Sequence, residues 1–293
     1  MAKRRFGDRR DARWVREAPA MQSIMAYICP DRTDNEAYLK ETIDITELKR
    51  FLDEKNAEHP DYKTTVFHCL IFAIAKMIHE RPKMNYFLQG HRIYERNEIS
   101  LAFVCRRRFV DHSEEALMFF TPKEEDTLDT LSYKIAGEVH ETRKSEVATG
   151  GIDDLLNKFA AIPRFLLIPI FGIIRSLDFW GKNPKVLTDG DPNYSSCFLS
   201  NLGSVGCDAV YHHLSNYGTN SFFVTMGVMR KQERINEDGT KEIRDVMDIG
   251  AIVDERIADG FYFARSLKLV KYLFKNPELM EKTLYTESEF DYK

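Results

Sequence analysis

The sequence lacks the signatures of several large protein classes. Its five cysteines are an odd number without C-x-x-C spacing, so a disulfide framework and a zinc ribbon are both disfavoured, and a reducing cytoplasm is the expected location. The 42 basic and 46 acidic residues give a net charge of −4, which offers no electrostatic basis for nucleic acid as the main partner. No apolar core follows the basic N-terminus, so we expect no signal peptide.

Long hydrophobic runs are also missing. The strongest apolar segment, Phe165 to Ile174, is bounded by Arg164 and Arg175. It has about half of the roughly 20 apolar residues that a spanning helix needs. We therefore expect no membrane span.

The 293 residues have an ordinary globular composition, 43% hydrophobic and 30% charged, and we expect a single domain over residues 1–293. Hydrophobic periodicity predicts strands and helices in irregular order. Strands are expected at 36–45, 92–94, 98–105, 116–120, 196–200, 221–229 and 244–253, and helices after Asp44, at 65–80, at 127–143, at 155–180 with breaks at Pro163 and Pro169, and from 263. This order predicts an α+β fold, with helices packed on a mixed, mostly antiparallel sheet.

Two segments stand apart from this pattern. Residues 1–35 form an N-terminal arm, and residues 1–16 hold seven basic residues. We favour a solvated arm over one that docks on a neighbouring subunit or an anionic ligand. In residues 147–193 the pair Gly150-Gly151 breaks the chain, and an apolar, proline-containing stretch follows, which indicates an insertion that covers another part of the molecule.

The most informative stretch joins a buried strand to a helix. The apolar run 249–253 leads into Asp254-Glu255-Arg256, and Asp259-Gly260 leads out into a helix that Pro277 ends. A tight charged turn at the edge of a sheet is a common place to hold reactive groups. We therefore expect the functional site here.

This turn resembles the HxxxDG motif of the chloramphenicol acetyltransferase and dihydrolipoamide acyltransferase superfamily, with Glu255 at the histidine position. Two other stretches carry the same resemblance. Residues 72–104 are similar to the helix, turn and strands of these acyltransferase catalytic domains, and residues 198–206 (FLSNLGSVG) are similar to their TISNLGxxG loop. The resemblance covers roughly residues 36–280 apart from the insertion, and it implies a chloramphenicol acetyltransferase-like fold.

The resemblance also implies an activity and an assembly. Such enzymes are trimers with each active site between two subunits, and coenzyme A is a substrate, with no metal. By motif matching, Ser200 would stabilise the oxyanion, Asp259 would hold the turn through a salt bridge to an arginine, and Gly260 would allow its sharp bend. Asn201, Asp254 and Arg256 match residues that flank the site and its channel.

Glu255 leaves two interpretations of the activity open. A thiol has a reference pKa of about 8.5 and a solvated glutamate one of about 4.3, so an unperturbed carboxylate is a weak base for this reaction. An apolar pocket can raise a carboxyl pKa by several units, which would make Glu255 a retuned base in an acyltransferase. The alternative is a catalytically inactive trimer, a pseudoenzyme that binds a ligand or acts as a scaffold.

Histidines elsewhere offer a replacement base. His212 and His213 follow the Ser200 loop and would reach the same channel, although a pair of surface or interface histidines is the interpretation we favour. Metal binding by this pair with Cys197 and Cys207 is disfavoured by the spacing.

The sequence shows no lipoyl domain ahead of the acyltransferase-like region, so we expect a stand-alone relative that takes a small-molecule acyl thioester as its partner. The apolar insertion has three interpretations. It lines a tunnel for a long acyl chain, lies on a membrane surface with Arg164 and Arg175 toward the headgroups, or adds packing in a trimer, which we favour.

Overall fold

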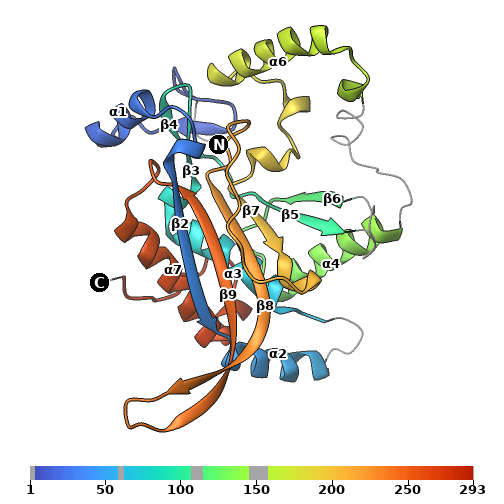
Figure 1. Cartoon of the computed structure of the whole chain (residues 1–293), viewed down its shortest axis with the longest axis vertical. Coiled ribbons are helices and arrows are strands. Elements are labelled where there is room, and N and C mark those ends of the chain that lie inside the picture. The colour runs from blue at the N-terminus through green and yellow to red at the C-terminus, as the bar shows by residue number, and fades with distance from the viewer. Residues whose placement is uncertain (1–3, 59–62, 107–114, 145–157, 293) are drawn as a thin grey trace.

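The computed structural model describes residues 4–58, 63–106, 115–144 and 158–292. A six-stranded sheet in the order β2-β9-β8-β7-β5-β6 runs through the molecule, and a three-stranded sheet in the order β1-β4-β3 lies at one end (Figure 1). The strands are β1 (Ala12–Trp14), β2 (Glu36–Asp44), β3 (Tyr86–Gln89), β4 (Arg92–Arg96), β5 (Leu101–Arg106), β6 (Glu115–Phe120), β7 (Cys197–Asn201), β8 (Phe222–Ile235) and β9 (Lys241–Asp254). In the large sheet β7 runs parallel to β5 and β8, and the other pairs are antiparallel. The predicted mixed, mostly antiparallel sheet with packed helices is confirmed.

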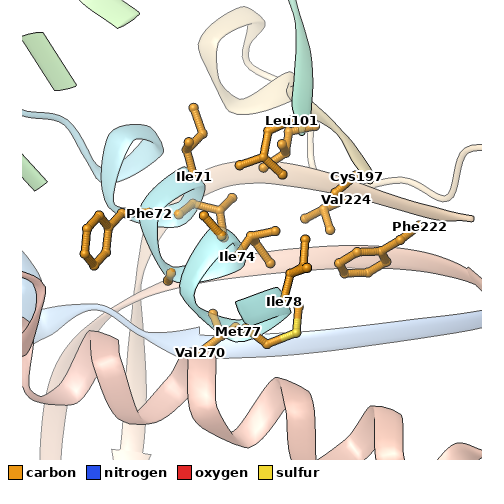
Figure 2. Packing of buried hydrophobic residues seen from close by; sticks show 14 of the residues in the cluster. Ile71, Phe72, Ile74, Met77, Ile78, Leu101, Cys197, Phe222, Val224 and Val270 are labelled. Carbon is orange, nitrogen blue, oxygen red and sulfur yellow. The ribbon is translucent and has the colours of Figure 1, made fainter. Parts of the chain in front are cut away.

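The helices are α1 (Ala20–Ile28), α2 (Thr46–Glu58), α3 (Val66–Glu80), α4 (Leu128–Lys144), α6 (Arg164–Phe179) and α7 (Gly260–Lys275). The core forms around α3, which is buried along nearly its whole length. Figure 2 shows Ile71, Ile74 and Ile78 of this helix beside strand residues such as Leu101 and Val224. Burying an aliphatic side chain of this size contributes about 1.5–3 kcal/mol. The helix predicted at 65–80 is therefore a central element of the core, packed against the sheet.

The N-terminal segment departs from the prediction. β1 pairs with β4, and the Arg9 side chain is only 5% exposed. Arg9 donates to Asp11 at 3.0 Å and to Asp178 of α6 at 3.1 Å. The expectation of a solvated arm is wrong for this segment, because a carboxylate far along the chain pairs with its guanidinium.

The insertion also differs in part from the prediction. α6 continues through Pro169, where a break was expected, and Pro163 lies directly before its first residue. Residues 147–157 of the predicted insertion lie outside the described residues. Along the described ranges, no helix combines the length and the hydropathy that a membrane crossing requires.

His68 in the first turn of α3 gives the fold a predicted pH dependence. Burial lowers its pKa from 6.5 to about 4, and its Nδ1 accepts the backbone N–H of Thr65 at 3.3 Å. The unfolded chain therefore takes up a proton near pH 6.5 while the folded chain stays neutral, so stability is complete above pH 6.5 and falls toward pH 4, by about 3 kcal/mol. Glutamine at this position can still complete the capping box. We expect His68→Gln to remove this decrease in the free energy of unfolding between pH 6.5 and pH 4, measured by urea titration at each pH. A decrease as large as that of the wild type would contradict this role of His68.

Candidate active site

The turn that follows β9 is held by backbone hydrogen bonds on both sides. The N–H of Asp254 donates to Ser221 at 2.9 Å, and that of Glu255 donates to the carbonyl of Asn35 at 2.9 Å. Asp259 then begins α7, with its Oδ1 accepting the N–H of Tyr262 at 2.8 Å. Side-chain oxygens at this position satisfy the free donors of a helix start. The turn is therefore fixed between a strand end and a capped helix.

A buried ion cluster lies beneath the turn. Asp254 is fully buried, and its two oxygens accept from Arg256 Nε at 2.8 Å and Nη2 at 2.6 Å. Arg32, 3% exposed, places its Nε 3.8 Å from the same carboxylate. Arg256 also donates to the carbonyls of Cys29 at 2.7 Å and Pro30 at 3.0 Å. Two guanidinium groups thus share one carboxylate and attach the turn to residues 29–32.

Burial is the main cause that lowers the pKa of Arg32, since its interaction with Asp254 favours the charge while the nearby Arg256 opposes it. Its guanidinium also donates to the carbonyls of Ser215, Leu88 and Gly218. These bonds offset part of the cost of burying this charge. Arg32 therefore ties four separate segments together behind the turn.

Glu255 is the exposed residue of this cluster. Its neighbours Asp254 and Arg256 point into the protein, whereas the Glu255 side chain is accessible to solvent. Among the residues that the structure describes, none shields this side chain from solvent, so apolar surroundings for it would have to come from outside them.

The structure shows Asp259 and Gly260 in settings that differ from those the resemblance implies. The resemblance implies a salt bridge from Asp259 to an arginine, whereas the structure shows this carboxylate as the helix cap, and the ion pair of the turn belongs to Asp254 and Arg256. Gly260 does not have the left-handed backbone of a glycine turn, and a Cβ there would meet no atom within 4 Å. The bend of the turn therefore does not require glycine at this position.

The Ser200 loop lies at the end of β7. Ser200 is half-buried and pairs with Thr225 of β8. Asn201 begins a single helical turn, with its Oδ1 accepting the N–H of Ser204 at 3.1 Å. A hydroxyl at such a strand end can reach solvent or a bound molecule while its backbone stays in the sheet.

Gly203 makes this loop possible. A Cβ there would lie 2.4 Å from the carbonyl oxygen of Gly227, where β8 has an irregular register. We expect Gly203→Ala to destabilise the protein by about 1–3 kcal/mol, as overpacking does. Gly172→Ala is a matched control, because a Cβ at this helical glycine meets nothing within 4 Å and alanine favours helices. Thermal unfolding of both variants tests this, and equal melting temperatures would contradict it.

His212 and His213 are exposed, which agrees with the interpretation of the pair as surface or interface histidines. The His212 ring stacks on Phe223 with ring centres 4.3 Å apart. Phe223 pairs with Phe198 on one side and Ile252 on the other, so His212 lies over the sheet between the Ser200 loop and the Glu255 turn. A role as replacement base stays a prediction.

Ser200 and Glu255 do not meet within one chain. Ser200 pairs with Thr225, and Thr225 pairs with Gly250, five residues before Glu255 on β9. Ser200 and Glu255 are therefore separated by roughly 17 Å along the strands, for five residues, and by roughly 10 Å across the sheet, for two strand spacings. A single reacting group cannot contact both side chains of the same chain.

A cavity of about 200 Å³ lies behind the turn, and sequence reasoning missed it. Its polar walls come from Arg32, Arg256, Gln89, His91 and Asn216. Within the described ranges, no group of three potential metal-ligating side chains is found. Asp31 also lines the cavity, which is therefore a polar, hydrogen-bonding space at the base of the Glu255 turn.

His91 forms part of the cavity wall at the tip of the β3–β4 hairpin. Its Nδ1 lies 2.6 Å from the carbonyl oxygen of Ala26, and its φ of 58° is unusual for a residue other than glycine. The glycine–histidine pair between two strands is the only sequence signal for this turn. No sequence pattern indicated that His91 would lie near Arg256, because they come from segments far apart in the chain.

Comparison with known proteins supports the resemblance of these motifs. The family model "2-oxoacid dehydrogenases acyltransferase (catalytic domain)" matches residues 184–281, which include both the Ser200 loop and the Glu255 turn. No curated protein sequence matches the chain.

Solved structures extend the likeness to nearly the whole chain. A probable dihydrolipoamide acetyltransferase from Listeria monocytogenes is 17% identical with a TM-score of 0.58, covering 95% of each chain. Dihydrolipoamide acetyltransferase from Azotobacter vinelandii is 16% identical with a TM-score of 0.60, covering 91% of this chain and 93% of that one. A chloramphenicol acetyltransferase is 12% identical with a TM-score of 0.51, covering 90% and 99%. The segment 184–281 thus matches the catalytic-domain family of the 2-oxoacid dehydrogenase acyltransferases, and the chain as a whole has the fold that these enzymes share with chloramphenicol acetyltransferase.

Proposed function

We propose that the protein is an acyltransferase that moves an acyl group between a coenzyme A thioester and an acceptor, at a site between two subunits of a homotrimer. Ser200 comes from one subunit and Glu255 from the next. The observation that carries this proposal is their placement: both are accessible, both lie in the family-matched segment, and they are too far apart to act together in one chain.

Each group has a defined step in the proposed reaction. Glu255 accepts the proton of the acceptor nucleophile, which attacks the thioester carbonyl carbon. The Ser200 hydroxyl donates a hydrogen bond to the oxygen that becomes negative, a contribution on the order of 3 kcal/mol to the transition state. The tetrahedral intermediate then expels coenzyme A as a thiolate, which takes the proton back from Glu255. A neighbouring subunit that covers Glu255 would strengthen it as a base.

The related structures support the proposal in two ways. The roles of a serine, a histidine and an asparagine in the catalytic mechanism of the Azotobacter vinelandii enzyme have been investigated, with the asparagine four residues after the histidine. Here Ser200 has the corresponding residue type, and Asp259 stands four residues after Glu255. Another similar structure is the cubic core of a pyruvate dehydrogenase multienzyme complex, and cubic symmetry contains threefold axes.

Subunit mixing tests the site directly. Ser200→Ala and Glu255→Gln chains are each expected to be about a hundredfold or more slower than the wild type as pure trimers. After mixing in equal amounts with subunit exchange, about one quarter of the interfaces join an intact Ser200 to an intact Glu255, so about one quarter of wild-type activity should return. The measurement is acyl transfer from a panel of acyl-coenzyme A thioesters of different chain length. No recovery in trimers shown by mass spectrometry to be mixed would refute a shared site.

Binding of the donor is tested separately. A thermal-shift series with coenzyme A and its thioesters should raise the melting temperature, because a ligand of the native state stabilises that state. If none of them does so and none is turned over, the acyltransferase proposal is refuted.

A second candidate function is a trimeric binding or scaffold protein without turnover. The solvent exposure of Glu255 favours it, since an exposed carboxylate is a weak base toward a thiol. In this case coenzyme A binding would be retained without any measurable transfer.

A further inference from the structure

α6 is an apolar helix whose surface is mostly uncovered. Of its 16 residues only Ile174 and Asp178 are buried. The exposed fractions of Phe165, Ile168 and Ile173 are 73%, 65% and 61%. α3 is similarly apolar, but the sheet and α7 cover it, whereas α6 lies at one end of the molecule, away from the large sheet (Figure 1). Apolar surface of this extent indicates a contact with another surface.

The exposed charged side chains of residues 158–187 are all positive. Residues 158–187 contain five cations, all exposed, and a single acid, Asp178, which is buried and paired with Arg9. The cations are Lys158, Arg164, Arg175, Lys182 and Lys185. The chain as a whole has a net charge of −4, so this segment is a local basic region on an acidic protein. A second copy of the same segment would bring like charges together, and an anionic surface would neutralise them.

α1 continues the same surface. It has no charged residue, and Met21, Ile24, Tyr27 and Ile28 are each more than half exposed. His91 joins the two helices, with its ring stacked on Tyr27 at 4.6 Å and against Phe179 at 5.3 Å. Figure 1 places α1 and α6 at the same end of the molecule. The apolar side chains of both helices can therefore meet one surface together.

We propose that this end of the molecule docks on an anionic lipid bilayer, with α6 lying in the plane of the headgroups. A 16-residue helix is about 24 Å long, shorter than the roughly 30 Å hydrocarbon core, and apolar helices with flanking cations bind at the interface. Trp180 directly after α6 is 68% exposed, and tryptophan favours this boundary. The proposal does not depend on acyltransferase activity.

Vesicle co-sedimentation tests the proposal. The full-length protein should bind vesicles of phosphatidylcholine mixed with phosphatidylglycerol, bind pure phosphatidylcholine far more weakly, and lose affinity as salt rises. Phe165→Ser with Ile168→Ser should lower the vesicle affinity about tenfold or more, because two apolar side chains no longer enter the lipid. Arg175→Gln and Lys182→Gln should each lower it about fivefold.

The control substitutions lie on the β8–β9 hairpin. Ile235→Ser and Ile243→Ser remove side chains of similar exposure, 65% and 62%, and should leave vesicle binding unchanged. The proposal is overturned by any of three results: no binding to anionic vesicles, equal binding to neutral ones, or binding that the α6 variants do not weaken. If the α6 variants instead change the oligomer mass in light scattering while wild-type protein ignores vesicles, the surface is a subunit interface.

Discussion

Replacing Glu255 with glutamine is expected to lower the rate of acyl transfer by about 10² to 10⁴, the usual contribution of a general base. Glutamine keeps the size and reach of the side chain but cannot accept a proton. Because Glu255 is exposed and contacts the fold through its backbone N–H to Asn35, the substitution should leave the melting temperature nearly unchanged. The loss should therefore appear in kcat, with coenzyme A binding retained.

The comparison variant is Glu237→Gln, at the exposed tip of the β8–β9 hairpin, which removes the same charge far from the turn. Equal rates for wild type and both variants would show that Glu255 is not the base. A rate loss shared by both variants would reflect net charge. If only the Glu255 variant is slow, the pseudoenzyme interpretation fails.

A histidine in place of Glu255 separates two further possibilities. If the site retains the geometry of a general base, Glu255→His supplies a side chain with a reference pKa of about 6.5, closer to that of a thiol, and transfer should become faster at neutral pH. If Glu255 is tuned by a covering subunit, the histidine variant should be no faster, because the surroundings that favour a neutral carboxyl also oppose an imidazolium.

Much of the fold was predictable because the signals were local. The strand predicted at 36–45 is β2 at Glu36–Asp44, and the helix predicted at 65–80 is α3 at Val66–Glu80. In each case a regular apolar pattern ends at a recognisable cap or turn. The charged turn between strand and helix was likewise predictable, since the apolar run 249–253 leads into it and the periodic segment that Pro277 ends leads out of it.

The features that sequence reasoning missed depend on distant partners. β1 forms because its residues meet β4, and Arg9 is buried because Asp178 of α6 faces it. The salt bridge expected for Asp259 could not be distinguished from the pair Asp254–Arg256, since motif spacing does not reveal which side chains turn inward. The polar cavity at Arg32 and His91 combines five segments, and no local pattern indicates such an arrangement.

The ion cluster beneath the turn gives the largest expected effect on stability. Asp254 is the only carboxylate that contacts both Arg32 and Arg256 among the ion pairs of the described residues, and all three side chains are at most 3% exposed. Asp254→Asn keeps the shape but leaves two buried guanidinium groups without their counter-charge. Removing one partner of a buried ion pair costs about 3–5 kcal/mol, so the free energy of unfolding in urea should fall by about that amount.

A matched control separates the effect of breaking a buried ion pair from the effect of removing a carboxylate charge. Glu242→Gln removes the carboxylate that pairs with Arg244 at 2.8 Å, where both side chains are more than a quarter exposed, and it should cost less than about 1 kcal/mol. If Asp254→Asn costs no more than this control, the guanidinium groups find other partners and the cluster does not hold the turn. If Asp254→Asn lowers the free energy of unfolding far more than the control does, the buried ion pair between Asp254 and Arg256, on either side of Glu255, keeps the turn rigid. The residue at the candidate site can then change from base to inert group without loss of the fold, which is how one scaffold can support either an enzyme or a binding protein.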